Sequence, residues 1–286
     1  MLRRLLVPLG LAVALATGGC KLTWAPPPLE NPLPINVGPG GAALTVPGNW
    51  DCRVNMPPVP VTGRIRINGC RNIVMIGGQV EIPGPPNGKP EEAGIFITDY
   101  TETAHIEGVE MGGKGLTNGL WLSTRYPGTI AQVENVLVRE LHAKVESANP
   151  ENWPEEHPDV LQTWQGPSVL RIDRLQGTSV YQGLLPDSAA WSNPRNTSLY
   201  MDIRNTNIRL TPTGVSCYAL FQTPLYSAPM TSLKNVFCDP GSRPWHAALI
   251  PNAGWWDDVQ RTPAGLPAFV DAQKVGIGYE SPGYEP

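Results

Sequence analysis

Short apolar and polar steps recur along the chain in two series that alternate in a fixed order, which indicates a degenerate structural repeat. In the first series, a polar residue and then Asn, Gly or Arg stand between apolar positions. Its members are Cys70-Arg-Asn-Ile73, Ile106-Glu-Gly-Val109, Val133-Glu-Asn-Val136, Ile172-Asp-Arg-Leu175, Leu233-Lys-Asn-Val236 and the poorer match Ile203-Arg-Asn-Thr206. The second series consists of brief apolar runs: Gly94-Ile-Phe-Ile97, Gly119-Leu-Trp-Leu122, Val160-Leu-Gln-Thr163, Gly183-Leu-Leu-Pro186 and Tyr218-Ala-Leu-Phe221.

This repeat predicts stacked parallel strands. A strand of four or five residues is not stable alone, but equivalent strands stacked about 4.8 Å apart form parallel sheets around a continuous apolar core. Asn and Gly allow the tight bends between such sheets. No stretch keeps an apolar period of 3.6 residues over three turns, so helices between the strands are not expected. We predict an all-β fold, a right-handed parallel β-helix (solenoid) over residues 42–240. The alternative is a β-sandwich, which predicts hairpins.

The two-series pattern, over roughly residues 44–240, resembles that of the pectate-lyase-like family of single-stranded right-handed β-helices. A likeness of repeat style implies the fold more than an activity. Members of that family typically use clustered Asp residues for calcium and an Arg as base. This chain has no Asp cluster near such an Arg, which argues against calcium-dependent pectate cleavage, and we expect neither a metal nor a cofactor.

The N-terminus has the pattern of an export signal. Met1-Leu-Arg-Arg4 is basic, residues 5–16 are apolar, and Thr17-Gly-Gly-Cys20 ends the segment with small residues. This resembles a secretory signal with a bacterial lipobox, and the resemblance implies cleavage after residue 19 and lipidation of Cys20. We expect a Pro/Gly-rich extended tether over residues 20–41 and a capping tail over residues 241–286. The protein is then exported and held at a bacterial membrane by a lipid anchor, or is extracellular.

Cysteine use and charge narrow the class further. Without Cys20, four cysteines remain, and an even number in an exported chain favours disulfides over metal ligation. We favour the pairs Cys52–Cys70 and Cys217–Cys238, each about one solenoid turn apart, with the other pairings left open. The net charge of -4 and pI near 5.6 give no basic stripe for nucleic acid. We expect a monomer.

Candidate chemistry is concentrated in His157-Pro-Asp-Val-Leu-Gln162. This segment resembles the His-x-Asp-x-x-Gln step of several secreted β-helix carbohydrate proteins. In register with the second series, Gln162 points outward between Trp121 and Leu185, with Phe96 one turn further. Asp159 and Gln182 then match one turn apart, with His157 and Tyr181 at the strand entrance.

Three chemistries fit these residues. A glycoside hydrolase needs two carboxyls about 5–10 Å apart, for which Asp159 and Asp187 are the best pair, with Glu155 or Glu156 in reserve. A polysaccharide lyase needs a base and a cation for the substrate carboxylate. The candidate bases are His157 and Tyr181, and the candidate cations are Arg125, Lys144 and Arg195. A binding surface without catalysis needs only aromatic and amide groups. The candidates are Trp121, Trp164, Gln162 and Gln182.

Each candidate also has a structural interpretation. His157 or Asp159 would cap a bend, the two glutamines would form an amide ladder, and the tryptophans would pack under loops. Two inserts, residues 144–156 and 188–198, leave from this neighbourhood, and loops on a rigid scaffold commonly carry function. We therefore predict a carbohydrate-active protein, a polysaccharide lyase or glycoside hydrolase with a polysaccharide or glycan as its partner. The alternative is a glycan-binding or structural surface lipoprotein without catalysis.

Overall fold

The protein is built from strands stacked in two sheets. The computed structural model describes residues 21–84, 93–143, 157–187, 199–211, 219–222, 230–241, 249–250, 255–266 and 268–285. These residues contain no helix, which agrees with the all-β prediction.

The first sheet has eleven strands and the second has eight. Along the first run β1 (Leu33–Asn36), β3 (Cys52–Asn55), β5 (Ile73–Ile76), β8 (Thr103–Glu107), β11 (Ile130–Val138), β13 (Val169–Ser179), β15 (Tyr200–Leu210), β17 (Met230–Asp239) and β19 (Gln260–Arg261), with β6 (Gln79–Glu81) and β9 (Glu110–Gly112) beside this path. The second contains β2 (Ala42–Val46), β4 (Ile65–Gly69), β7 (Ala93–Thr98), β10 (Asn118–Ser123), β12 (Asp159–Gln162), β14 (Gln182–Leu185), β16 (Ala219–Gln222) and β18 (Leu249–Ile250).

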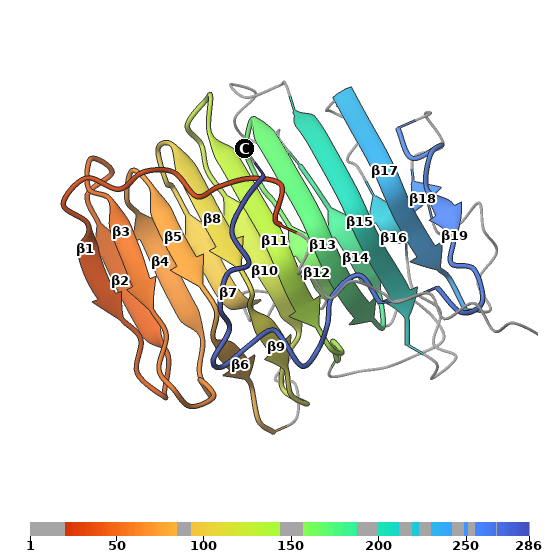
Figure 1. Ribbon diagram of the computed structural model, residues 1–286, viewed down its shortest axis with the longest axis horizontal. Helices are drawn as coiled ribbons and strands as arrows, with labels where there is room; N and C mark the ends of the chain where they lie inside the picture. The colour runs from red at the N-terminus through yellow and green to blue at the C-terminus, as the bar shows by residue number, and fades with distance from the viewer. Residues whose placement is uncertain are drawn as a thin grey trace, which may run out of the picture.

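The chain visits the two sheets in turn, and each strand pairs with the equivalent strands before and after it (Figure 1). All pairings between named strands are parallel, for example β12 with β10 and β14. Among the described residues, none of the named strands forms the antiparallel hairpin that a β-sandwich would use. The arrangement is therefore compatible with a parallel β-helix.

The first series of sequence steps marks a bend within the eleven-stranded sheet. Its third residue lies in the left-handed region at five stacked positions: Gly108 (φ 66), Asn135 (φ 54), Arg174 (φ 59), Asn205 (φ 45) and Asn235 (φ 56). Gly and Asn reach this conformation at low cost, which explains the recurrence of Asn and Gly there. The amides also bond along the stack, since Asn235 Nδ2 donates to Asn205 Oδ1 (3.0 Å) and Asn205 Nδ2 donates to Asp173 Oδ1 (2.7 Å).

Two members of the predicted series are out of register. The Cys70-Arg-Asn-Ile73 step does not form this bend, because the equivalent left-handed residue is Gly77 (φ 69), which follows β5. In the second series, Leu184 pairs with Phe221, which places Leu220 rather than Tyr218 beside Gly183. In both cases a short apolar run offers more than one alignment, and packing selects one of them.

The core lies between the two sheets. Its inward residues stack turn upon turn, as in the row Ile65, Ile95, Leu120, Leu161, Leu184 and Phe221 of the eight-stranded sheet, all 0% exposed. At the far end, Trp256 is buried and packs edge-on against Phe221, with 5.1 Å between ring centroids. The stack thus closes over its last strands with an aromatic pair.

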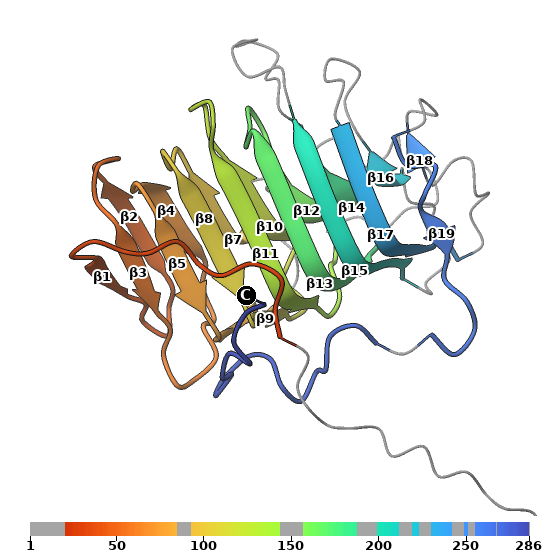
Figure 2. The ribbon, with the colours of Figure 1, turned by 45° about the horizontal axis from the view of Figure 1, so that its top comes forward.

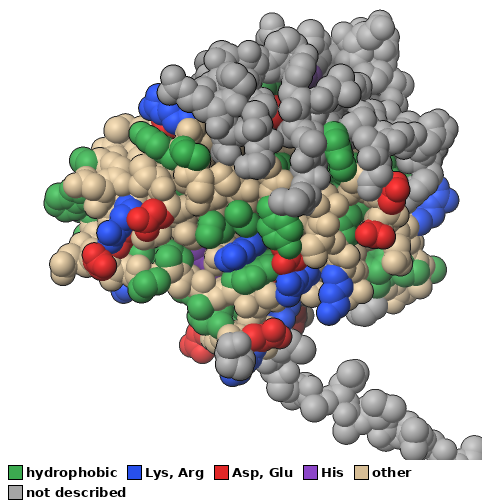
Figure 3. Space-filling view, turned by 90° about the horizontal axis from the view of Figure 1, so that it is seen from above, with side chains coloured by type: hydrophobic (Ala, Val, Ile, Leu, Met, Phe, Trp, Pro, Cys, Tyr) green, Lys and Arg blue, Asp and Glu red, His purple; other side chains and the backbone are tan. Residues whose placement is uncertain are grey.

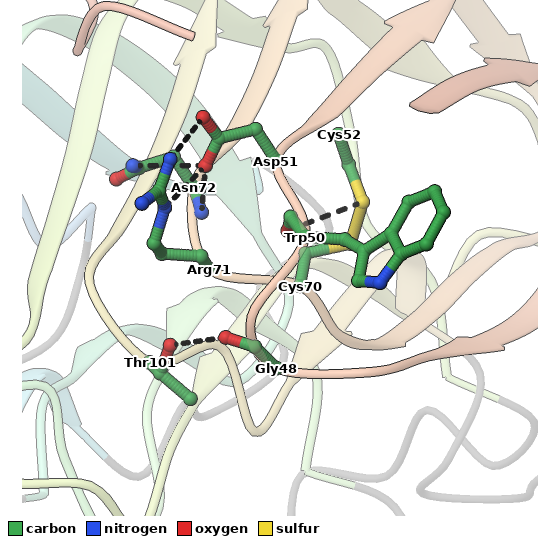
Figure 4. The surroundings of a disulfide bond; sticks show 8 residues. All are labelled: Gly48, Trp50, Asp51, Cys52, Cys70, Arg71, Asn72 and Thr101. Carbon is green, nitrogen blue, oxygen red and sulfur yellow. Dashed lines mark hydrogen bonds and ion pairs between the residues drawn. A yellow bond between two sulfur atoms is a disulfide. The ribbon is translucent and has the colours of Figure 1, made fainter. Parts of the chain in front are cut away.

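At the first turns a disulfide and an ion-pair network fix the loop after β2 (Figure 4). Cys52 and Cys70 form the expected disulfide across 18 residues. Beside it, the buried carboxylate of Asp51 accepts two hydrogen bonds from Arg71, both of 2.8 Å, and one from Asn72 Nδ2. The Arg71 guanidinium holds the pKa of Asp51 well below its usual range. Cys217 lies outside the described residues, and its predicted partner Cys238 is buried.

Both ends of the described chain run back over the outer face of the eleven-stranded sheet (Figure 2). They meet at a parallel bridge between Leu22 and Tyr284. Leu22 is fully buried, and β1 pairs with β3, so residues 21–41 pack on the protein instead of forming the expected extended tether. Val270 and Val275 of the C-terminal segment pack against Leu137.

Candidate functional site

The candidate site lies on the outward row of the eight-stranded sheet. The register places Gln162 between Trp121 and Leu185, and it places Phe96 next to Trp121, as the sequence predicted. The rings of Phe96 and Trp121 are 4.9 Å apart and tilted by 44°. Along this row the exposure changes: Phe96 and Trp121 are half-buried, whereas Gln162 and Leu185 are buried. The accessible part of the row is therefore its aromatic part.

Arg66 extends this row by one turn, and the sequence reasoning missed it. Arg66 pairs in register with Phe96, and its guanidinium carbon lies 4.6 Å from the centroid of that ring. The signal was present, because Ile65-Arg-Ile-Asn68 alternates strictly and places Arg66 outward. Arg66 and Phe96 also line a surface groove of about 470 Å³ whose remaining walls are Gly40, Gly41, Ala42, Ala43 and Arg64.

A row of small polar side chains runs beside the aromatic row. Asn68 Nδ2 donates to Thr98 Oγ1 (2.8 Å) on the next strand. Ser123 Oγ accepts from the Trp121 indole N–H (2.7 Å) and from the backbone N–H of Trp164 (2.7 Å). These bonds hold the plane of the Trp121 ring and connect the strand end after β12 to β10. Ser123 is buried, so the accessible polar groups beside the aromatic rings are the Asn68 amide and the Thr98 hydroxyl.

Asp159 is the most unusual side chain of the region. It is fully buried at the start of β12, its backbone N–H donates to Asn118 Oδ1 (2.8 Å), and it stands in register with Gln182 as predicted. Within the described part of the chain, neither of its carboxyl oxygens has a hydrogen-bond partner. Burial raises the pKa of Asp159 well above its usual value, because an ionised carboxylate is poorly solvated there. The site therefore favours the neutral form of this carboxyl over the ionised form.

His157 and Tyr181 stand together at the strand entrance, as the sequence predicted. Their rings stack with 5.1 Å between centroids and only 5° between planes. Desolvation lowers the pKa of His157 below its usual value, which favours the neutral imidazole. Directly after Tyr181, the backbone N–H of Gln182 donates to Pro158 O (2.9 Å), which fixes the entrance of β14 against that of β12.

The structure does not bring Asp187 or Arg125 to this entrance. Gln182 is the register partner of Asp159, and Asp187 lies five residues further along the chain. Five strand residues span about 16 Å, so Asp187 is about that far from Asp159 along the strands. Its backbone N–H donates to Thr163 Oγ1 (2.7 Å) at the opposite end of β12. Arg125 follows the end of β10 and pairs with Asp99 (2.9 Å). Neither the carboxyl pair of a glycosidase nor the base–cation pair of a lyase is therefore assembled from these described residues.

Several predicted residues cannot be placed in this geometry. Cys20, Lys144, Glu155, Glu156 and Arg195, together with both inserts, lie outside the described residues. Trp164, which is described, is half-buried, and its indole N–H is enclosed without a hydrogen-bond partner in the described part of the protein.

The charged side chains of the described surface are mixed in sign, and its potential metal ligands do not form a group. On the face drawn in Figure 3, Lys and Arg side chains lie beside Asp and Glu side chains rather than in one basic stripe. The described residues contain no group of three or more His, Cys, Asp or Glu side chains placed to hold a metal ion. They also contain no helix long and apolar enough to cross a membrane.

In comparisons with known proteins, no family model, no curated protein and no solved structure matches the chain.

Proposed function

We propose that the protein is an exported glycan-binding protein built on a right-handed parallel β-helix of the pectate-lyase-like type. The observation that carries the proposal is the accessible row Arg66–Phe96–Trp121 beside the half-buried polar side chains of Asn68 and Thr98. Aromatic faces pack against the C–H faces of sugar rings, and amides and hydroxyls bond sugar hydroxyls. Successive turns are about 4.8 Å apart, close to the length of one sugar unit, so an extended glycan would lie across the strands.

The charge in this row indicates an acidic glycan. Arg66 lies over Phe96 with its guanidinium at the wall of the groove, where it would bond a uronate carboxylate or a sulfate through paired N–H groups. Export is supported by the Cys52–Cys70 disulfide, because such bonds persist in oxidising compartments. The proposal includes a lipid anchor on Cys20 that holds the protein at a bacterial membrane.

The test is titration of the protein against a panel of acidic and neutral oligosaccharides. The Cys20→Ala background keeps the sample free of acyl chains. We expect at least one acidic glycan to bind, with Trp121→Ala and Phe96→Ala each weakening binding at least tenfold. Trp50→Ala is the matched control, since Trp50 is 49% exposed and belongs to the loop before the disulfide rather than to the row. Binding that is unchanged in Trp121→Ala, or no binding by the whole panel, would refute the proposal.

A second candidate is an enzyme that cleaves a glycan, and the observation in its favour is Asp159. A carboxyl whose pKa is raised by burial, such as Asp159, is suited to protonate a leaving-group oxygen, and an imidazole whose pKa is lowered, such as His157, is suited to accept a proton. Product release from the same panel would reveal this activity. Loss of turnover in both Asp159→Asn and His157→Ala, with binding retained, would support the enzyme, whereas binding without turnover on every glycan supports the binding protein.

A further inference from the structure

The first turn of the stack ends in an open strand edge on β2. This strand is the last of the eight-stranded sheet, and among the described residues no further strand pairs with its outer edge. Three consecutive residues of β2, Ala43, Leu44 and Thr45, are exposed. An exposed edge of this kind presents backbone groups that are ready to pair with another strand.

The register shows which backbone groups are unused. The Ala42 N–H donates to Arg64 O (2.9 Å) and the Cys70 N–H donates to Val46 O, so even-numbered residues of β2 face β4. Ala43 and Thr45 therefore direct their N–H and C=O groups away from the sheet. In the described part of the protein these four groups have no hydrogen-bond partner. The edge thus offers two donors and two acceptors in the spacing that a β-strand requires.

The neighbouring edge on β1 is closed by its sequence. The Leu33 N–H donates to Asp51 O (2.8 Å) and the Val37 N–H donates to Asn55 O (3.0 Å), so odd-numbered residues of β1 face β3. Pro34 then occupies an outward position, where it has no N–H to offer, and proline on an edge strand blocks strand addition. The protein therefore protects one of its two sheet edges at this end and leaves the other open.

The composition around the edge indicates an uncharged partner. Residues 31–50 contain no charged side chain, although charges are a usual protection of edge strands. Leu44 points to the core side of the sheet, in register with Ile67, yet 42% of it is exposed because no turn of the described chain covers it. A partner that fits must supply an uncharged strand and an apolar side chain opposite Leu44.

We propose that β2 of one molecule pairs antiparallel with β2 of a second copy about a two-fold axis at Leu44. This axis places Ala43 opposite Thr45 of the second copy, so each pair exchanges two N–H···O bonds and the dimer gains four. The two Leu44 side chains then face each other at the non-hydrogen-bonded position, where Cα atoms are about 4.5 Å apart. The edge is complementary to itself, and the dimer replaces the monomer expected from sequence. It does not depend on the glycan proposal.

Cross-linking tests the axis directly. Because Leu44 Cα atoms about 4.5 Å apart lie within the disulfide range, Leu44→Cys in the Cys20→Ala background should form a covalent dimer on mild oxidation. Ile277→Cys is the matched control, since Ile277 is similarly exposed (40%) but belongs to the C-terminal segment. The proposal fails if Leu44→Cys remains monomeric or cross-links no faster than Ile277→Cys.

Sedimentation tests the dimer without a new cysteine. We expect a concentration-dependent dimer in the Cys20→Ala protein, and Leu44→Lys should weaken it at least tenfold by placing two like charges opposite each other. Ile277→Lys should leave it unchanged, and thermal unfolding of dilute samples shows whether either variant is damaged. A monomer at every concentration, or association that Leu44→Lys leaves intact, would overturn the inference; the first of these outcomes leaves the edge to a strand from another protein.

Discussion

The outer face of each sheet carries polar residues stacked in rows, but the rows of the two sheets make different contacts. On the eleven-stranded sheet, His105, Gln132 and Arg171 are in register, and each is bonded to the next: His105 Nδ1 to Gln132 Nε2 (3.0 Å), and Arg171 Nη1 to Gln132 Oε1 (3.1 Å). The terminal segments cover this face and bond to it. On the eight-stranded sheet, the outward row ends in accessible aromatic rings. Asp159, on the same side of β12 as the inward Leu161, is buried without a partner for its carboxyl in the described chain.

The difference separates two uses of a buried polar group. A buried charge with a complete set of partners contributes to structure, whereas a buried group without partners costs free energy that only a function would justify. Glu107 represents the first case and Asp159 the second. Substitutions at the two positions should therefore change stability in opposite directions.

The largest effect is expected from Glu107→Ala. The Glu107 carboxylate is fully buried and is bonded to His105 Nε2 (3.0 Å), Tyr279 Oη (2.8 Å) and Tyr284 Oη (2.6 Å). Its removal leaves these groups without their acceptor and releases the C-terminal segment, so the free energy of unfolding should fall by about 3–5 kcal/mol. Urea unfolding measures this loss, and Glu107→Gln, which keeps an acceptor oxygen, should lose less.

The matched control for that experiment is Glu140→Ala, since the Glu140 side chain is 44% exposed. Its loss should stay within about 0.5 kcal/mol. If Glu107→Ala costs no more than Glu140→Ala, the covered face is not held by its polar network.

A pH effect of intermediate size is expected at Glu134, beneath the N-terminal segment. Its carboxylate accepts hydrogen bonds from the backbone N–H groups of Trp24 (2.6 Å) and Thr23 (3.0 Å). Burial, with the nearby Asp173 and Glu107 carboxylates, raises the pKa of Glu134 from 4.5 to about 8. The folded state then holds a proton that the unfolded state releases, so this group's contribution to stability is present below pH 4.5 and is lost as the pH rises to 8.

Unfolding free energies measured from pH 5 to 9 test this sign. The unmodified protein should lose stability relative to Glu134→Gln, with a slope of up to about 1.4 kcal/mol per pH unit below pH 8. Titrating groups that do not interact with Glu134 contribute equally to both proteins and cancel in the difference. If the plots of unfolding free energy against pH are parallel for the two proteins, the Glu134 proton is not linked to folding.

The sequence predicted the stacking of the strands but did not predict the terminal segments that cover the stack. The two series predict the two sheets, because inward apolar residues repeat once per turn and Asn or Gly marks the bend at positions such as Asn135 and Gly108. The packing of Leu22 against the C-terminal segment was not predictable, since it joins residues more than 250 positions apart and leaves no periodic signal. The register errors at Cys70 and Tyr218 arose where apolar runs were too short to define one alignment.

The candidate site was also predictable only in part. Register alone predicted that Gln162 lies beside Trp121 and that Asp159 lies beside Gln182. It did not predict exposure, because the burial of Gln162 depends on surroundings that strand alternation does not encode. Arg66 was not predicted because its strand has no polar step like that of residues 157–162, although Arg66 belongs to the accessible end of the same row.

The smallest stability effect, and the one of opposite sign, is expected from Asp159→Leu. An unpartnered buried carboxyl loses its hydration without compensation, so replacing it by an apolar group of similar size should raise the free energy of unfolding by about 1–2 kcal/mol at pH 7.

Asp173→Leu is the matched comparison. Asp173 is equally buried, but its carboxylate accepts from Asn205 Nδ2 (2.7 Å) and Thr23 Oγ1 (2.8 Å), so the same change there should destabilise. Destabilisation by both substitutions would mean that Asp159 contributes to structure in the way Asp173 does, and the observation favouring catalysis would lose its force. A gain at Asp159 with a loss at Asp173 would mark Asp159 as a residue retained at a cost to stability.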